Sequence, residues 1–438
     1  MRGAINRIKA TSVGRAMFLL ETKRFYPTKT WKTLPLHLAV KTAAGEKLAP
    51  SPAVREGINM EWPEFHNGVA SALQMIHSGA AINSHWLFHG QGSAPNATHA
   101  GFLLGIGLLG KIAGLGKVHA WRYLVNRHNL TSLAIMLGLA ATYIGTNDRV
   151  AFTLLSIQLP PFLPPDSTAL NIPFQTQAAG LLGVGLIFLG SDQRSKADVL
   201  VRQIEPPELE SKDLRAEYRE GHALAAGFAL GLIMLCKARR DSLDSQADLN
   251  ILNKLHALMD GHGLQPAQSA EFCHIELGVT SVPATMALAF IFLRSNRNDI
   301  AARIKMPIAA EKVDEIRPDL LLARALARSL IMWDAIQPTT AWIESQLPVF
   351  MRGFKLDQAR ESPDDEAVQL AYINIRMALC FAIGLKYAGP RPNIQAATTL
   401  QQEFDQLFEQ ARARGKSSRK LIIKIWSVLT QVMFLSQR

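Results

Sequence analysis

The feature that most constrains this chain is a set of apolar helical segments to which glycine returns repeatedly. The clearest is QAAGLLGVGLIFLG at 177–190, in which four glycines are spread among leucines. Glycine inside a helix costs roughly 1 kcal/mol relative to alanine, so a chain that keeps glycines there must gain something from them. The gain that fits is close approach, because a residue without a side chain lets one helix backbone lie against another.

Related segments recur along the chain as Ala/Gly-rich runs that end in Leu-Gly or in bulky apolar residues. They lie at 66–75, 99–110, 132–145, 177–190, 222–236, 283–295, 322–333 and 374–389. Their small marker residues are about 30 to 60 positions apart, close to the period of a stacked helical array in which each unit buries its apolar face against its neighbours. The sequence therefore predicts an all-α array of helical hairpins.

We divide the chain into three parts by this pattern. Residues 1–61 form a lead-in with a helix and a short strand segment, 62–395 the helical array, and 396–438 the C-terminal helices. In the lead-in, apolar residues alternate from Thr33 to Lys41, which is the period of a strand and predicts a small β segment. At the other end, LQQEFDQLFEQARARG at 400–415 has the spacing of an amphipathic helix.

Charge and cysteine content exclude some classes of function. The chain has 47 Lys and Arg against 36 Asp and Glu, a formal net charge of +11. Apart from RARGKSSRK at 412–420 this excess is dispersed, and no basic helix carries interleaved aromatics, so we expect no nucleic-acid binding. Cys236, Cys273 and Cys380 lie far apart, which argues against disulfides and fits a reducing compartment.

A membrane protein is the alternative that the apolar segments raise. Each uninterrupted run is about 10–14 residues long, short of the roughly 20 that a spanning helix needs, and charged residues end several of them. The N-terminus has basic residues but only a short apolar run, so no signal peptide is evident. We therefore expect no membrane-spanning helix.

The segment from Gly105 to Lys111 matches the GxGxxG pattern of dinucleotide-binding loops. That fingerprint needs a preceding strand and an acidic residue about 20 positions later, and neither is evident here. A phosphate loop also needs Ser or Thr after the lysine, where this chain has Ile112. Because the same glycines recur in the other repeats, we expect no nucleotide cofactor.

Other candidates for chemistry are incomplete. His85 and His89 would share a helix face, but the HExxH motif is absent and no third ligand is spaced nearby, so we expect no metal site. HGQGS at 89–93 has some likeness to an oxyanion-hole turn, yet the chain contains no GxSxG nucleophile motif. The sequence predicts no catalytic site, so we expect a protein that is not an enzyme.

The repeated Ala/Gly-rich units resemble the proteasome/cyclosome (PC) repeat. This repeat occurs in the two largest non-ATPase subunits of the proteasome regulatory particle and in the largest subunit of the anaphase-promoting complex. The segments that favour the second family are Gly14–Phe18, WPEFHNGVA at 62–70, HAGFLLGIGL at 99–108, LLSIQLPPFLPP at 154–165, LNIPFQTQAAGLLGVGL at 170–186 and LLARALARSLIMWD at 321–334. The resemblance runs from about residue 13 to about residue 410, and a proteasome regulatory subunit is the alternative.

This resemblance implies helical hairpins closed into a ring and a scaffold role in a multisubunit cullin–RING ubiquitin ligase. The implied partners are the cullin–RING module, the tetratricopeptide-repeat subunits, the jelly-roll substrate-receptor subunit and the coactivator, in the nucleus and the cytoplasm. Members of the family are longer and begin with a β-propeller, which we do not find here. Eight repeats are also fewer than a closed ring would need, so degenerate copies would complete it or the array stays open.

The physical reading of the glycines agrees with the resemblance. Helices that crowd together need small residues at their contacts, and the repeats place glycine there. The predicted structural glycines are Gly101, Gly105, Gly107, Gly138, Gly180, Gly183, Gly185, Gly227 and Gly231. On this reading, Gly183→Leu would overpack the contact at a cost of about 1–3 kcal/mol.

Overall fold

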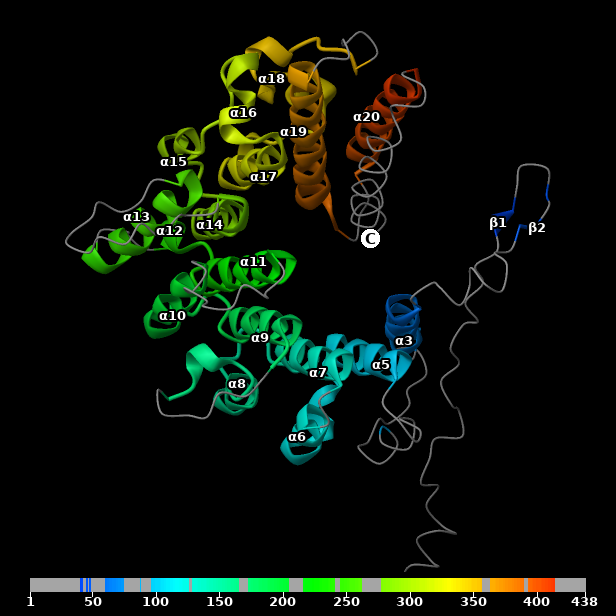
Figure 1. Ribbon diagram of the computed structural model, residues 1–438, viewed down its shortest axis with the longest axis vertical. Helices are drawn as coiled ribbons and strands as arrows, with labels where there is room; N and C mark the ends of the chain where they lie inside the picture. The colour runs from blue at the N-terminus through cyan, green and yellow to red at the C-terminus, as the bar shows by residue number, and fades with distance from the viewer. Residues whose placement is uncertain are drawn as a thin grey trace, which may run out of the picture. The chain divides into compact units, whose positions relative to one another are not determined.

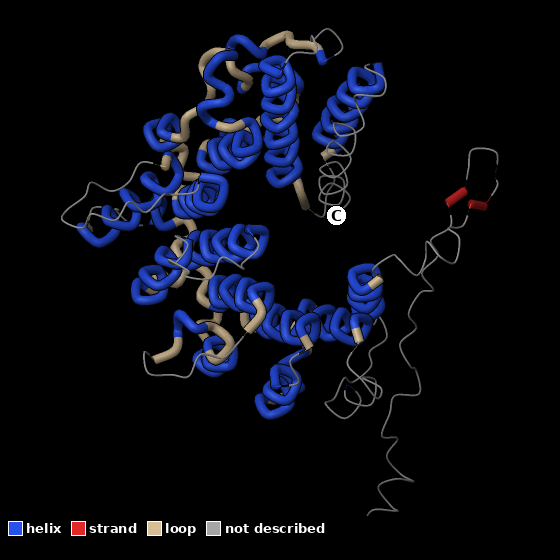
Figure 2. Tube along the Cα trace, viewed as in Figure 1, coloured by secondary structure: helices blue, strands red, loops and turns tan. Residues whose placement is uncertain are grey.

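The structure is a computed structural model of the chain. It describes residues 40–41, 45, 47–48, 60–74, 87, 96–125, 128–164, 172–204, 216–240, 245–261, 277–356, 363–389 and 393–413. The chain divides into two compact units, Met1–Ile187 and Phe188–Arg438. Helices dominate both units (Figure 2), so the predicted all-α repeat fold is confirmed.

The first unit is a row of helices that follow one another in space as they do in sequence. Its helices are α3 Glu61–Gln74, α5 Ala97–Leu108, α6 Lys117–Val125, α7 Asn129–Thr142, α8 Arg149–Ser156 and α9 Phe174–Ile187. Helices α3, α5, α7 and α9 pack against one another in that order (Figure 1), while α6 packs on α7 and α8 on α9. The glycine-rich helices thus form one layer, and the intervening helices lie against it.

The second unit repeats this construction. Its helices are α10 Arg194–Ile204, α11 Ala216–Ile233, α12 Lys237–Arg240, α13 Gln246–Asp260, α14 Leu277–Ile291, α15 Asn298–Arg303, α16 Val313–Ile316, α17 Leu321–Ile331, α18 Thr340–Gln346, α19 Pro363–Tyr387 and α20 Ile394–Ala413. Helices α11, α14, α17 and α19 pack in succession, and α10, α13, α15 and α18 lie against them (Figure 1). The closed ring that the resemblance implies stays a prediction.

Local sequence fixes where the helices begin. The side chain of Asn96 accepts a hydrogen bond from the His99 backbone at 2.7 Å and caps α5. Asp148 caps α8 in the same way, and Ser245 caps α13. Such caps satisfy backbone N–H groups that have no partner inside the helix, and each contributes about 1 kcal/mol to helix stability.

The layered helices owe their stability to burial on every side. Helices α5, α7, α9 and α14 carry apolar or small residues around almost their whole circumference, as helices do that are covered on all faces. Helix α20 is different, because only one stripe of it is buried. That stripe contains Leu400, Phe404 and Leu407, the apolar positions of the predicted amphipathic helix, which is confirmed.

The β structure near the N-terminus is small. Strand β1, Val40–Lys41, pairs antiparallel with β2, Lys47–Leu48, with Val40 opposite Leu48. This pair includes the end of the predicted strand segment, whose residues 33–39 lie outside the described residues. The residues beyond Ala413, which include most of the basic stretch at 412–420, lie outside them as well.

Two helices are longer than the apolar runs in the sequence indicate. The stretches Arg219–Arg239 and Glu366–Tyr387 are long and apolar enough to cross a membrane by length and composition. Core helices of folded proteins pass the same test, and 83% of the apolar window of the second stretch is buried inside the protein. The expectation of no membrane-spanning helix therefore stays a prediction, and the apolar runs of these two helices are longer than we expected.

Candidate functional site

The nine predicted glycines all lie on the layered helices, and several touch a neighbouring backbone. A methyl group at Gly101 of α5 would overlap the carbonyl oxygen of Phe65 on α3. A methyl group at Gly105 would lie 2.5 Å from the Cβ atom of Ala72, also on α3. Any side chain at Gly101 would therefore push α3 and α5 apart.

Helices α5 and α7 meet glycine to glycine. A methyl group at Gly107 would overlap the Cα atom of Gly138. The Thr142 hydroxyl lies 3.0 Å from the carbonyl oxygen of Gly107 and 2.9 Å from that of Gly138, so it ties the ends of both helices together. The close approach and the hydrogen bond depend on each other, because a wider spacing would move Gly107 out of reach.

The glycines of α9 face side chains rather than backbone. A methyl group at Gly180 would lie 2.5 Å from the terminal carbon of Met136, and one at Gly183 would lie 2.6 Å from a methyl carbon of Leu155. Gly185 is buried within the same helix. Since flexible side chains can shift, these positions tolerate a small residue better than those that face backbone.

Helices α11 and α14 meet at a proline that the sequence analysis did not single out. A methyl group at Gly227 would lie 2.5 Å from both the carbonyl oxygen and the Cβ atom of Pro283, which stands inside α14. One turn further along α11, a methyl group at Gly231 would lie 2.9 Å from the Cβ atom of Phe290. On α3, Gly68 was also missed, and it faces the carbonyl oxygen of Thr98 as closely as Gly101 faces Phe65.

Backbone hydrogen bonds from the turns also link successive repeats. Gly145 and Asn147 both have positive φ, and their N–H groups donate to the carbonyl oxygens of Leu186 and Ile187, at 2.9 and 3.1 Å. The second unit repeats this turn twice. There, Gly190 and Asp192 donate to Leu232 and Ile233, and Arg294 and Asn296 donate to Leu330 and Ile331.

These turns share a short sequence signature. IGTN at 144–147, LGSD at 189–192 and LRSN at 293–296 each place an aliphatic residue, Gly or Arg, Ser or Thr, and Asn or Asp in order. The signature satisfies two carbonyl groups at the end of the next layered helix, which have no partner inside that helix. It could have been found in the sequence, but only by aligning the four residues at the end of each repeat.

Two groups of charges support the second unit. The Lys237 ammonium lies 2.8 Å from the Asp192 carboxylate and 2.9 Å from that of Asp248, which also pairs with Arg194. Burial opposes the charged form of Lys237, but the hydrogen bonds to the two carboxylates outweigh it and raise the pKa of the ammonium. Because Asp192 belongs to one of the repeat turns, this network joins the turn to α12 and α13.

The second group joins α20 to the array. Arg376 of α19 is 3% exposed and lies 2.7 Å from the Glu403 carboxylate of α20, which is 1% exposed. It also pairs with Glu344 of α18 at 3.0 Å and donates a hydrogen bond to the Tyr372 hydroxyl. Burial raises the pKa of Glu403, and the guanidinium of Arg376 opposes that shift.

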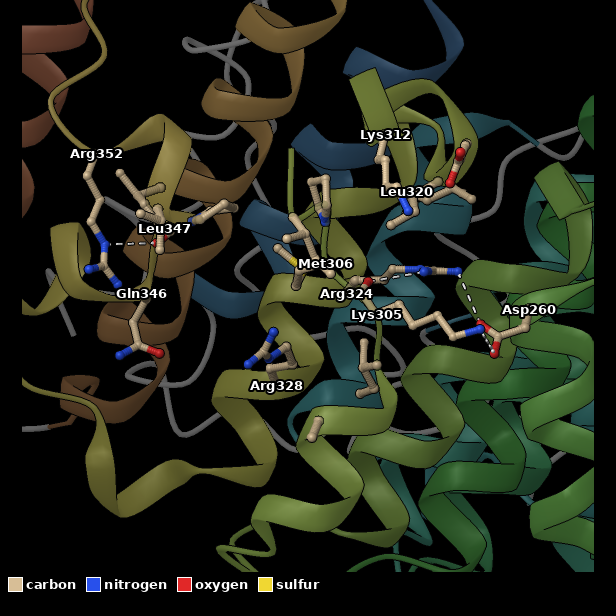
Figure 3. A pocket seen from close by; sticks show the side chains of 18 of the residues that line it. Asp260, Lys305, Met306, Lys312, Leu320, Arg324, Arg328, Gln346, Leu347 and Arg352 are labelled. Atoms are coloured by element: carbon tan, nitrogen blue, oxygen red, sulfur yellow. Dashed lines mark hydrogen bonds and ion pairs between the residues drawn. The ribbon is translucent and has the colours of Figure 1, made fainter. Parts of the chain in front are cut away.

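A pocket of about 800 Å³ opens beside α17 in the second unit (Figure 3). Arg324 and Arg328 of α17, the segment 304–308, and residues 345–352 line it. Arg324 donates to the backbone oxygens of Lys305 and Met259, both at 3.1 Å, and so holds that side of the pocket in place. Arg324 and Arg328 lie in the predicted repeat at 322–333, but the sequence analysis assigned no role to them or to the other residues of the pocket.

The candidates for enzyme chemistry do not form a site in the described part of the chain. The GxGxxG segment runs along and past the end of α5. Gly105 faces α3 and Gly107 faces α7, whereas Gly110 lies in the turn after the helix, where no atom comes within 4 Å of the position of a Cβ. His85, His89 and the HGQGS segment lie outside the described residues. Within the described ranges, no group of three or more His, Cys, Asp or Glu residues could hold a metal ion.

The fold and its contacts define a class: a helical-repeat protein whose distinctive residues serve the contacts between its own helices. The comparisons with known proteins narrow this class. Residues 149–437 match the family described as "APC1 fifth domain", and residues 1–144 match "APC1 fourth domain". The chain belongs to the family of anaphase-promoting complex subunit 1.

Curated relatives agree with this assignment. The chain is 36% identical over 338 residues to "Negative regulator of mitosis" of Emericella nidulans, which covers 76% of the chain and 16% of that protein. It is 34% identical over 378 residues to "Anaphase-promoting complex subunit 1" of Schizosaccharomyces pombe, covering 86% of the chain and 25% of that protein.

The human protein of the same name is 33% identical over 414 residues, which cover 87% of the chain and 21% of that protein. The family resemblance is therefore confirmed, and the alternative of a proteasome subunit finds no support. The chain spans about a fifth of the length of these relatives.

Proposed function

We propose that this chain is a non-catalytic scaffold within the anaphase-promoting complex, a multisubunit cullin–RING ubiquitin ligase. The observation that carries the proposal is the run of close contacts between successive layered helices, in a chain that belongs to this family. Contacts such as Gly107 against Gly138 and Gly227 against Pro283 fix the spacing of neighbouring helices. A row of helices with fixed spacing presents an extended surface, which repeat proteins use for binding.

The proposed partners are other subunits of the complex. They are the cullin–RING module, the tetratricopeptide-repeat subunits, the jelly-roll substrate-receptor subunit and the coactivator, which together ubiquitinate cell-cycle regulators. We propose that the chain acts in the nucleus and the cytoplasm and binds neither nucleic acid nor membrane. The names of its relatives support partners within the anaphase-promoting complex.

Affinity purification followed by mass spectrometry tests the proposal. We expect the tagged chain, expressed in dividing cells, to retain the cullin and the tetratricopeptide-repeat subunits. Recovery of proteasomal ATPase subunits in their place would contradict the proposal. The same tag fused to a scrambled sequence of similar length serves as the control for non-specific binding.

The absence of a catalytic role has its own test. A calorimetric titration of the purified chain with NAD and with ATP should give no heat beyond dilution, because Gly105 and Gly107 of the GxGxxG segment face neighbouring helices. Saturable heat from either nucleotide, lost on Lys111→Ala, would favour an enzyme that uses this segment.

A further inference from the structure

The pocket of the second unit carries an excess of positive charge. Among the described residues, five cations and two carboxylates line it. The cations are Lys305, Lys312, Arg324, Arg328 and Arg352, and the carboxylates are Asp260 and Glu315. Asp260 is already shared, since Lys305 lies 3.2 Å and Arg324 lies 3.7 Å from its oxygens. The lining therefore has three more positive than negative charges.

Arg328 and the exposed Lys312 are the cations of the pocket that the described protein leaves unpaired, and Arg328 is the more buried of the two. Its guanidinium makes no hydrogen bond and no ion pair with any described residue. The side chain is half-buried, and burial lowers the pKa of the guanidinium. An arginine still stays charged at neutral pH, so a poorly hydrated positive charge faces the pocket without a counter-ion.

Arg352 adds donors from the opposite side. Within the part of the chain that the structure describes, its guanidinium donates to two backbone groups, the carbonyl oxygens of Ser345 at 3.0 Å and Leu347 at 3.3 Å. Figure 3 shows Arg328 between Arg352 on one side and Lys305 with Asp260 on the other. Since a guanidinium offers five N–H donors in a planar fork, both arginines retain donors that match a carboxylate.

Apolar side chains complete the surface. Ile308 and Val349, which line the pocket from two different segments, are 82% and 76% exposed. Exposed apolar side chains at the edge of a concave surface are suited to contact with a binding partner. Because the pocket offers both basic groups and exposed apolar groups, a polypeptide that carries charged and apolar side chains fits it better than a compact small molecule.

We propose that this pocket binds an acidic segment of a partner protein. A carboxylate of the segment pairs with Arg328 and Arg352, and an apolar side chain next to it covers Ile308 and Val349. Arginine is among the residues that dominate binding energy at protein interfaces, and surrounding contacts such as those of Ile308 and Val349 exclude water from it. The proposal stands apart from the ligase assignment, because it rests on the charge and the apolar residues of the pocket alone.

Selection from a phage-displayed library of random peptides tests the proposal on the full 438-residue chain. We expect the enriched peptides to share Asp or Glu beside Leu, Ile or Phe. The best peptide, labelled with fluorescein, is then titrated with the chain by fluorescence anisotropy. Its affinity should fall about tenfold or more with Arg328→Ala, because a desolvated charge pair is lost.

Matched variants separate binding from folding. Arg328→Lys should retain part of the affinity, and Arg202→Ala, which removes an exposed arginine of α10 away from the pocket, should leave it unchanged. Arg328→Ala should keep or raise the melting temperature, because the arginine has no partner in the described protein. Enrichment of neutral or basic peptides, an equal loss of affinity with Arg202→Ala, or an unchanged affinity with Arg328→Ala would overturn the proposal.

Discussion

Two glycines of α11 lie in different surroundings, and only one of them makes a contact that requires glycine. Gly227 has the carbonyl oxygen and Cβ atom of Pro283 where its own Cβ atom would be, whereas Gly221 has open space there. Both interrupt a helix that alanine would favour. Only the first gains a contact in return, so the contact and not the helix explains why glycine stands at 227.

Alanine at these two positions should therefore change stability in opposite directions. We expect Gly227→Ala to lower the free energy of unfolding by about 1–3 kcal/mol, because the methyl group must displace the α14 backbone. Gly221→Ala should raise it by about 0.5–1 kcal/mol through helix propensity. Urea unfolding followed by circular dichroism measures both, and equal effects would contradict the close-contact account.

A buried histidine of α5 makes stability depend on pH. Burial lowers the pKa of His99 to about 4, below its ordinary value of 6.5. As the pH falls below 6.5, the unfolded chain takes up the proton first, so stability is lost between pH 6.5 and pH 4. The loss from this residue amounts to about 2 kcal/mol at pH 5.

The variant His99→Gln should flatten this dependence, because glutamine does not titrate. The measurement is the difference in unfolding free energy between pH 7 and pH 5, compared with the unchanged chain. His222, whose pKa burial also lowers to about 4, should keep its own share in both proteins. An identical difference in the variant would show that His99 is not buried in its neutral form.

At the scale of elements, the turns between repeats depend on a left-handed residue. Gly145 has φ of 67°, and a side chain there would meet no atom within 4 Å, so conformation rather than space decides what fits. Gly145→Val should cost about 1–2 kcal/mol of stability, because a β-branched residue resists this conformation. Gly145→Asn should cost less, since asparagine tolerates it. Thermal unfolding ranks the two, and an equal cost would point to lost packing instead.

The buried ion pair between α19 and α20 should be costly to break from one side. Arg376→Met leaves the Glu403 carboxylate buried without its counter-ion, and we expect a loss of about 3–5 kcal/mol. The exposed pair of Arg317 and Asp319 is the control, and Asp319→Asn should cost less than about 1 kcal/mol. Proteolysis of the folded protein should also release α20 faster in Arg376→Met. A similar small cost for both variants would mean that the buried pair does not hold α20.

The elements also show what the sequence could and could not predict. The helical array was predictable, because Ala/Gly-rich apolar runs such as 177–190 repeat along the chain and glycine in a helix needs a reason. The left-handed turns were harder to predict, since Arg294 occupies a position where Gly145 and Gly190 stand in other repeats, so that only an alignment of the turns reveals their common signature. The length of α19 was not predicted either. Its buried segment contains the polar residues Asn374 and Arg376, which interrupt the apolar run in the sequence.

At the scale of the whole molecule, the site is harder to predict than the fold. Arg328, Ile308 and Val349 belong to three separate segments, and only the packing of α15, α17 and α18 brings them around one pocket. Repeat patterns report contacts between neighbouring units, so they predict the layers but not a surface built by irregular connections between them. Both units nevertheless share one construction, in which glycine contacts set the spacing and turns join successive repeats.

Our central proposal is that these contacts maintain a scaffold on which a ligase assembles. Quantitative mass spectrometry of proteins retained by the tagged chain tests it most directly, with a double variant carrying Gly101→Ala and Gly227→Ala and with Gly221→Ala as the matched control. We predict that the chain and the control retain the cullin and tetratricopeptide-repeat subunits equally and that the double variant retains them poorly. Equal retention by all three proteins, or retention of none of these subunits by the unchanged chain, would contradict the account.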